Sequence, residues 1–194
     1  MLLLLALGAC RHPATPPVLG EVPAFRLVER DGKPYGSAEL RGHVWVANFI
    51  FTTCPDICPA LTAQMRRLDG LLAADERPER VSISVDPARD TPEVLRRYAE
   101  QHGVGSDWTF LTGERQAIAS LLMEGFHVAF ADDGPPGQPI THSDRLVLVD
   151  PALRIRGYYH GRLEEDLERL VRDVRALRAE RAPAPGATDP QPPA

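Results

Sequence analysis

The sequence predicts an α/β domain in which helices cover a mixed β-sheet. Apolar, β-prone runs occur at residues 44–51, 80–85 and 145–149, and helical apolar patterns fall between them. The length of 194 residues and the hydrophobic content of 43% suit one domain with a substantial core. An alternation of strands and helices in a chain of this size indicates a sheet packed between helices.

The strands follow from composition and from the turns that bound them. Residues 44–51 are almost wholly apolar, which predicts a central strand buried on both faces. Residues 80–85 repeat this type, and residues 145–149 form a third run that ends at Asp-Pro. Residues 154–159 are predicted to pair with that third run as a hairpin across the Asp-Pro turn.

Four helices are expected from apolar spacing and capping residues. After Pro59 the apolar residues recur at intervals of four, three and four. Asp90 or Thr91 is predicted to cap a second helix that begins at Pro92. Residues 114–123 predict a shorter helix, and residues 164–178 a closing helix with one apolar stripe. Strand, helix, strand, helix, hairpin and closing helix is the order of a thioredoxin-like domain.

The N-terminal residues resemble an export signal. Residues 1–9 are apolar or small, a run too short to span a bilayer but typical of the central region of a signal peptide. The run ends Leu-Gly-Ala before Cys10, which resembles a bacterial lipobox, where cleavage precedes a cysteine that then carries a diacylglycerol. No Lys or Arg lies between Met1 and Leu2, so either the start lies upstream or the signal is weak. A chance leucine run beside an incidental Cys10 is the alternative.

These features predict four segments. Residues 1–9 form a lipoprotein signal peptide, and residues 10–22 a lipidated cysteine followed by a spacer. Residues 23–181 form the folded domain. Residues 182–194 are rich in Pro and Ala and predict a disordered tail, because such a segment buries too little apolar surface to offset its ordering entropy.

The net charge, the lengths of the apolar runs and the cysteine count exclude several classes of protein. The net charge of −5 excludes a dedicated nucleic-acid-binding protein, because neutralising phosphates needs a basic surface. No apolar run is long enough for a multispanning membrane protein. The three cysteines cannot all join a closed disulfide framework.

The most informative motif is Phe-Thr-Thr-Cys-Pro-Asp-Ile-Cys-Pro at residues 51–59, where the first strand gives way to a helix. In open α/β sheets, functional sites form beyond the carboxyl ends of strands. Pro59 fits the first helical position, which would place Cys58 at the cap and Cys54 on the preceding loop. The positive end of the helix would then lower the pKa of both thiols.

Two neighbouring thiolates permit two kinds of chemistry. They can form a disulfide or bind a soft metal, and Cu(I) suits a thiolate site of low coordination number, especially with one imidazole added. A structural zinc site would need four ligands, and the sequence has no second cysteine pair. A purely structural disulfide in an exported protein is the other interpretation.

Six histidines are candidates for a third ligand, and the sequence alone separates them weakly. His142 lies just before the strand at 145–149 and follows the Gly- and Pro-rich loop 131–139, so it could move toward or away from a metal. His127 lies in an apolar stretch and is predicted to be packed. On spacing alone His142 is only somewhat favoured over His127. The others are predicted to lie in the spacer or at the surface: His12, His43, His102 and His160.

The chain resembles the SCO/SenC family of copper chaperones along nearly the whole domain. The shared patterns are Pro-x-Phe-x-Leu at 23–27, Leu-x-Gly at 40–42, the cysteine motif at 51–59, Ser-Val-Asp-Pro-x-Arg-Asp-Thr-Pro at 84–92, and His-Ser at 142–143 before a strand ending in Asp-Pro at 150–151.

The resemblance implies a thioredoxin-like fold anchored on the extracytoplasmic, periplasmic side of a bacterial membrane. It implies copper, as Cu(I) or Cu(II), bound by Cys54, Cys58 and His142. It also implies delivery of that copper to the copper-carrying subunit of cytochrome c oxidase, where the binuclear copper centre is built. A periplasmic copper donor or a thiol reductase would be a further partner, and the lipid on Cys10 would hold the protein at the membrane.

A thiol–disulfide oxidoreductase is the alternative function, in which Cys54 and Cys58 cycle to reduce the oxidase subunit's cysteines. This chain differs from ordinary thioredoxins, because three residues instead of two separate its cysteines. It also has His142 and its neighbours where thioredoxins place a cis-proline. These differences favour a metallochaperone over a general disulfide-exchange enzyme.

Overall fold

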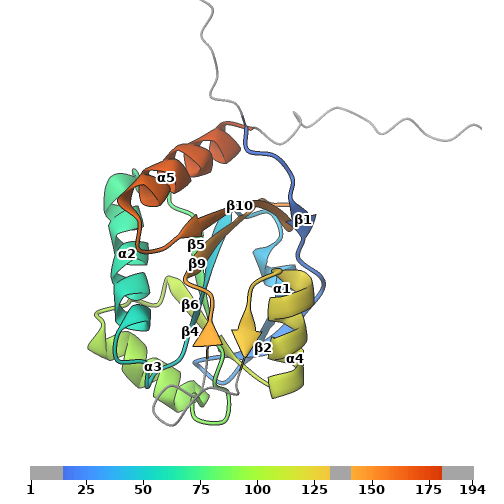
Figure 1. The fold of residues 1–194 in the computed structure, drawn as a ribbon, viewed down its shortest axis with the longest axis vertical. Coiled ribbons are helices and arrows are strands. Elements are labelled where there is room, and N and C mark those ends of the chain that lie inside the picture. Colours follow the sequence, from blue (N-terminus) through green and yellow to red (C-terminus); the bar gives the residue numbers. More distant parts are fainter. Residues whose placement is uncertain (1–14, 132–140, 181–194) are drawn as a thin grey trace, which may run out of the picture.

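The computed structural model describes residues 15–131 and 141–180, and it describes the side chains of all of these except residues 141 and 142. Within these residues the main sheet has eight strands in the order β1-β10-β9-β4-β5-β6-β2-β3 (Figure 1). These strands are β1 (Gly20–Glu21), β2 (Arg26–Glu29), β3 (Pro34–Gly36), β4 (Trp45–Ile50), β5 (Glu79–Ser84), β6 (Trp108–Thr112), β9 (Arg145–Val149) and β10 (Arg154–His160). A separate pair consists of β7 (Phe130–Ala131) and β8 (Thr141–His142).

Helices cover both faces of this sheet. They are α1 (Ser37–Leu40), α2 (Ile57–Leu71), α3 (Pro92–Gln101), α4 (Arg115–Ser120), a π-helix at Leu121–Gly125, and α5 (Glu164–Ala179). Figure 1 shows α2, α3 and α5 on one side of the central strands and α1 and α4 on the other. In the described part of the chain, no helix is long and apolar enough to cross a membrane.

The central strands β4, β5 and β6 pair in parallel, and every other pairing in the main sheet is antiparallel. β4 pairs in parallel with β5, and β5 pairs in parallel with β6. β9 runs antiparallel to β4, and β10 antiparallel to β9. The predicted mixed sheet between helices, of thioredoxin-like type, is therefore confirmed.

Apolar burial is concentrated where β4 crosses the middle of the sheet. Every residue of β4 is buried, as a central strand covered on both faces requires. The Phe126 ring packs edge-on against Trp45 and Phe49, with ring centroids 6.0 and 5.2 Å apart. Each aromatic side chain buried in this way contributes roughly 1.5–3 kcal/mol through lost apolar surface. This core fixes the C-terminal end of β4, from which the candidate site begins.

Local signals predicted the start of α3 and the buried face of α5 well. The Thr91 hydroxyl accepts a hydrogen bond from the Val94 N–H at 3.4 Å, and Pro92 takes the first helical position. The apolar stripe of α5 is fully buried, as expected: Leu167, Leu170, Val171, Val174 and Leu177. The prediction missed β6, which follows α3 and lies beside β5. It also missed that the helix at 114–123 is α4 followed by a π-helix ending at Gly125.

The described part of the predicted spacer, residues 15–22, makes contacts with the domain. β1 pairs with β10, and Val22 is buried. The buried guanidinium of Arg156 binds Asp150 at 2.7 Å and donates to the Pro16 carbonyl oxygen at 2.7 and 2.9 Å. A buried guanidinium must satisfy its remaining N–H groups, and the Pro16 backbone does this. Residues 1–14 and 181–194, which include Cys10 and the predicted tail, lie outside the described residues.

Candidate functional site

The structure brings Cys54 and Cys58 together where β4 gives way to α2. The backbone N–H of Cys58 points to the Cys54 sulfur at 3.4 Å, and the Phe51 N–H points to the Cys58 sulfur at 3.4 Å. Both side chains are thiols in this structure, and their relative exposures are 9% for Cys54 and 0% for Cys58. Cys54 is therefore the thiol that an approaching molecule meets first.

The helix begins earlier than Pro59 predicted. α2 starts at Ile57 with Asp56 at the N-cap, so Cys58 is the second helical residue and Pro59 the third. Proline is tolerated there because the N–H groups of the first turn have no partner within the helix. The expected placement of Cys58 at the cap was wrong by two residues, while the loop position of Cys54 was right.

Burial reverses the expected effect of the helix on Cys58. Removal from water raises the pKa of the Cys58 thiol well above its usual value, and the hydrogen bond from the Phe51 N–H opposes this rise only in part. The prediction that the helix end would lower the pKa of this thiol was therefore wrong. Burial therefore favours the protonated form of the Cys58 thiol.

A buried carboxylate ties the loop before Cys54 to the end of β5. Asp90 is fully buried and accepts hydrogen bonds from the Thr52 hydroxyl at 2.5 Å, the Thr52 N–H at 3.1 Å and the Ser84 hydroxyl at 2.6 Å. Burial raises the pKa of Asp90 above its usual value. Thr91 caps α3, so Asp90 serves the site instead of the helix. In the sequence, Asp90 stood out only as a candidate cap and as part of the shared pattern at residues 84–92.

A second polar contact fixes the first turn of α2. The Thr62 hydroxyl donates to the Cys58 carbonyl oxygen at 3.0 Å and lies 3.0 Å from the Tyr98 hydroxyl. Burial is the main reason that the pKa of Tyr98 is raised to about 12, so this hydroxyl stays neutral. Neither Thr62 nor Tyr98 stood out in the sequence, because single polar residues on apolar helix faces give no motif.

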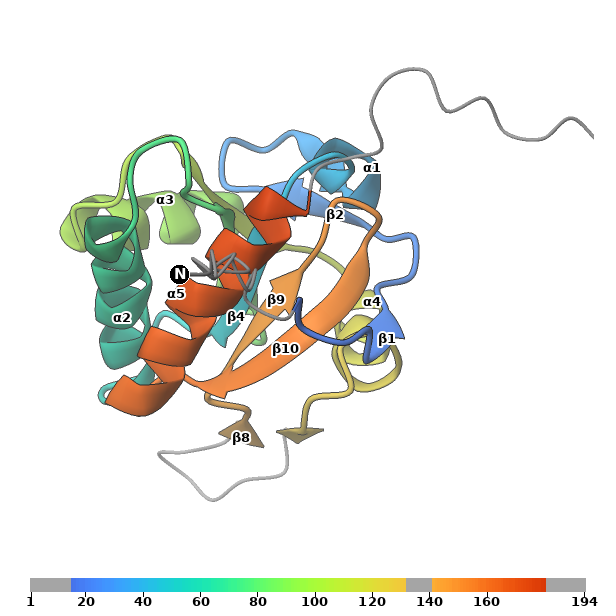
Figure 2. The ribbon, with the colours of Figure 1, turned by 90° about the horizontal axis from the view of Figure 1, so that it is seen from above.

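His142 lies on a hairpin that is separate from the main sheet. Its backbone lies in β8, where it pairs with Phe130 of β7, and the Ser143 N–H donates to the Ala129 carbonyl oxygen at 3.1 Å. Figure 2 shows β8 standing out from the main sheet. The side chain of His142 lies outside the described residues. Within the described side chains, no group of three or more His, Cys, Asp or Glu could hold a metal ion.

The other histidines divide between the surface and structural contacts. His127 is exposed, so the expectation that it would be packed was wrong. His43 is exposed, as predicted, and its Nδ1 lies 3.7 Å from Glu79. His102 and His160 are half-buried instead of fully exposed. Nδ1 of His102 lies 2.9 Å from the Tyr98 carbonyl oxygen, and Nδ1 of His160 lies 3.1 Å from the Asp144 carboxylate. His12 lies outside the described residues.

Comparison with known proteins agrees with this arrangement. The model of the SCO1/SenC family matches residues 15–179. The structure of a SCO1/SenC family lipoprotein from Bacillus anthracis str. Ames is 31% identical, with a TM-score of 0.77 over 85% of this chain and 99% of that one.

Two further solved structures are similar. BsSco, described as a member of the Sco family of cytochrome c oxidase assembly proteins with a disulfide switch, is 32% identical, with a TM-score of 0.73 over 84% and 98% of the two chains. Arabidopsis thaliana ScoI with copper bound is 26% identical, with a TM-score of 0.67 over 83% and 99%. The family model covers almost all of the described fold, including the loop of the two thiols and the hairpin of His142. The chain therefore belongs to the SCO1/SenC family.

Proposed function

We propose that this protein is a copper metallochaperone held at the extracytoplasmic face of a bacterial membrane, and that it delivers copper to the binuclear copper centre of cytochrome c oxidase. The observation that carries the proposal is the pair of neighbouring thiols where β4 gives way to α2, with each sulfur accepting a hydrogen bond from a backbone N–H. Two soft sulfur ligands in a site of low coordination number suit copper. The relatives described as copper-bound and as oxidase assembly proteins support this proposal.

In this proposal Cys54 and Cys58 hold the copper cargo, and His142 supplies the third ligand from its hairpin. Cys54 lies on the loop that leads into α2 and Cys58 lies in the first turn of that helix, whereas His142 belongs to a separate element. A ligand on a separate hairpin can join or leave the copper without moving the thiols. Such a ligand suits a protein that must both take up its cargo and release it.

The protonation of Cys58 defines one step of copper uptake. Because burial raises the pKa of this thiol, its proton leaves when copper binds the sulfur. Cys54 has more exposed surface and is the sulfur that a thiol of the acceptor subunit reaches first. Ligand exchange through Cys54 would then pass copper to the oxidase subunit without opening the core around Cys58.

Anchoring is proposed through Cys10. The apolar residues 1–9 ending Leu-Gly-Ala before Cys10 support cleavage there and attachment of a diacylglycerol. The related structure from Bacillus anthracis is described as a lipoprotein, which supports the same proposal. Metabolic labelling with a radioactive fatty acid tests it, because wild type should be labelled and a Cys10→Ala variant should not.

Copper titration of the reduced full chain tests the site. Wild type should bind one copper ion, and Cys54→Ala or His142→Ala should weaken copper binding by more than about 100-fold. A loss of this size exceeds the roughly 10–100-fold loss expected when a residue that only supports a metal ligand is removed. His43→Ala is the matched control, because His43 is exposed and precedes β4, whereas the thiols follow it. The proposal fails if both site variants bind copper as tightly as this control.

A thiol–disulfide role is the second candidate, and the closeness of Cys54 and Cys58 favours it. The related BsSco, described with a disulfide switch, supports the same chemistry. Complementation separates the two functions. Full rescue of oxidase assembly by His142→Ala would favour thiol chemistry, because that chemistry needs only the two cysteines. Loss of assembly with an unchanged reduction potential would favour copper delivery.

A further inference from the structure

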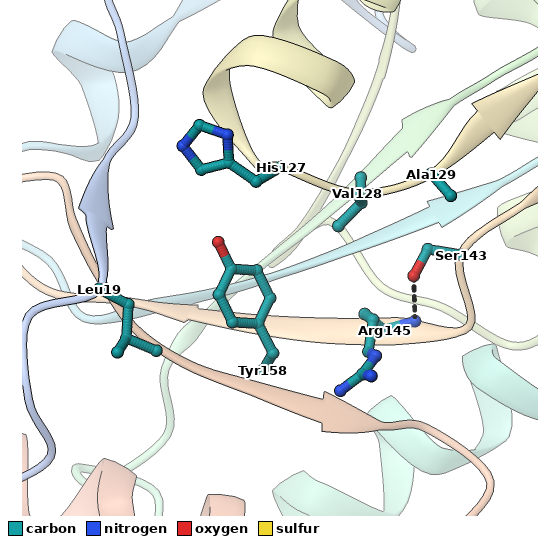
Figure 3. Close-up of a pocket in the computed structure, with 7 residues that line it drawn as sticks. All are labelled: Leu19, His127, Val128, Ala129, Ser143, Arg145 and Tyr158. Atoms are coloured by element: carbon teal, nitrogen blue, oxygen red, sulfur yellow. Dashed lines mark hydrogen bonds between the residues drawn. The ribbon is translucent and has the colours of Figure 1, made fainter.

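A cavity of about 550 Å³ lies beside the β7–β8 hairpin, and Figure 3 shows the residues that line it. Its walls come from the segment before β1, the segment after the π-helix, the start of β9 and the middle of β10. The volume lies within the range of about 300–1,000 Å³ that is typical of small-molecule sites. Neither Cys54 nor Cys58 lines it, so the cavity is separate from the thiol site.

Arg145 gives this cavity a positive charge without a neutralising partner. Across residues 15–131 and 141–180 no carboxylate pairs with its guanidinium, and no Asp or Glu lines the described wall. By contrast, Arg154 and Arg156 on the neighbouring strand both bind Asp150 at 2.7 Å. An Arg in a concave, partly buried place with no acidic partner is suited to an anionic ligand.

The sheet register and one unusual backbone conformation direct side chains into the cavity. Arg145 lies opposite His160 on β10, so Tyr158, two residues away, shares its face. His127 has a φ of +52°, a left-handed conformation that few residues other than glycine adopt. Its side chain is exposed at the cavity, while Phe126 and Val128 on either side are buried. Figure 3 shows the His127 ring across the cavity from Leu19 and Arg145.

The other side chains of the cavity wall suit the apolar part of a ligand. Leu19 is an exposed large apolar side chain, at 49% relative exposure, and it lines this cavity. The Tyr158 hydroxyl donates to the Phe126 carbonyl oxygen at 3.0 Å, so this residue offers the cavity the face of its ring. A compact inorganic anion would leave both apolar surfaces in contact with water. A ligand with an acidic head and a short apolar body would cover them.

We propose that this cavity binds a carboxylate that carries an apolar body. The planar guanidinium of Arg145 pairs with the carboxylate, a ring N–H of His127 donates to it, and the carbon chain lies against Leu19 and the Tyr158 ring. The carboxylate belongs either to a free organic acid or to an acidic side chain of a partner protein. Both sources present the same chemistry to the cavity.

The cavity is also continuous with the hairpin that carries His142. Ala129 and Ser143 line it, and the hydrogen bond between their backbones closes the base of that hairpin. A ligand that contacts His127 and Arg145 therefore touches both sides of the hairpin base. Binding should be detected at the backbone amides of residues 129–131 and 143–145.

Titration of the reduced full chain, followed by amide chemical shifts, tests the proposal. Hexanoate represents the free acid, and the blocked peptide acetyl-Ala-Glu-Ala-amide represents the acidic side chain. Hexan-1-ol supplies the apolar body alone, and inorganic phosphate supplies charge alone. At least one carboxylate probe should give saturable shifts at the hairpin base, and the tighter of the two identifies the source. The proposal is overturned if neither carboxylate binds, or if hexan-1-ol or phosphate binds equally well.

Substitutions then assign the contact. Arg145→Gln should weaken carboxylate binding by about tenfold or more, as expected for a lost charged hydrogen bond, and Arg145→Lys should restore part of it. Arg96→Gln is the matched control, because Arg96 is an exposed residue of α3, which contributes nothing to the cavity. His127→Gln, a change at an exposed side chain, provides a second variant if Arg145→Gln does not fold. Equal binding by the site variants and the control contradicts the assignment.

The same titration on Cys54→Ser keeps this proposal apart from the proposed copper function. Carboxylate binding should persist in that variant, because Cys54 does not line the cavity. A protein that binds hexanoate or the peptide but no copper would contradict only the copper proposal. A protein that binds copper but neither carboxylate would contradict only this one.

Discussion

Replacing Asp90 with alanine should destabilise the loop that presents Cys54. The carboxylate is fully buried and accepts hydrogen bonds from three donors, two on Thr52 and one on Ser84. Their loss leaves the buried Ser84 hydroxyl and the half-buried Thr52 N–H without this partner, at a cost of about 1–3 kcal/mol for each such group. Relief from burying a carboxylate offsets part of that cost. The net loss should be about 2–4 kcal/mol in the free energy of unfolding.

Thermal unfolding followed by circular dichroism measures this loss. For a chain of this size, about 1 kcal/mol corresponds to about 2–4 °C, so Tm should fall by roughly 5–15 °C. Asp75→Ala is the matched control, since Asp75 is exposed, and it should change stability by less than about 0.5 kcal/mol. Reagent access to Cys54 should increase in Asp90→Ala alone. Equal Tm values for the two variants would refute the structural role of Asp90.

The raised pKa of Asp90 predicts a pH dependence with a definite sign. Because the pKa of Asp90 is higher in the folded chain than in the unfolded chain, protonation of this carboxyl stabilises the fold. This stabilisation is fully present below the usual pKa of an aspartate, and it is lost as pH rises through the raised pKa of the folded state. Asp90→Asn has no such titration. The stability of wild type relative to Asp90→Asn should therefore decrease as pH rises across this window. An unchanged difference between acidic and neutral pH would contradict the shift.

Three further predictions concern other parts of the chain. The Cys58→Ser variant keeps only the thiol of Cys54 in this pair, and the Cys54→Ser variant keeps only that of Cys58. At neutral pH, Cys58→Ser should react faster with a disulfide reagent, because the Cys58 thiol is fully buried and has a raised pKa. Equal rates would contradict this order. Arg156→Ala should speed hydrogen exchange at the Leu19 amide, which donates to β10, because the guanidinium no longer holds the segment before β1. Thr91→Ala should cost about 1 kcal/mol, measured by urea unfolding, through loss of the cap of α3.

Elements with periodic apolar residues could be predicted from the sequence, and elements that depend on distant partners could not. β9 was predicted with both ends correct, because Asp-Pro follows it and its residues after Arg145 are all apolar. β1 is two residues long and exists only because β10 offers an edge and Arg156 holds Pro16. No local pattern in that Pro-rich segment indicates such pairing.

The cysteines of the candidate site could be predicted as a pair, but their electrostatics could not. The strand-to-helix junction was visible in the sequence, whereas the depth of Cys58 depends on how β4 and α3 pack around it. That depth decided the sign of its pKa shift, since the loss of water outweighs the helix field. Asp90 was predicted only as a candidate cap, because its contact with Thr52 joins residues thirty-eight positions apart in the chain.

In the proposed copper site, the two thiols would form a fixed part and His142 an adjustable part. Backbone N–H groups hold both sulfurs, and Asp90 fastens the loop beside them. His142 instead belongs to a two-stranded hairpin outside the main sheet. If the chain carries copper as we propose, the fixed thiols set the identity of the cargo, because they are present in every state. The hairpin sets how long the cargo stays, because only its ligand can withdraw without breaking the core. A carboxylate bound at the base of this hairpin would then act on retention of copper and leave selectivity unchanged.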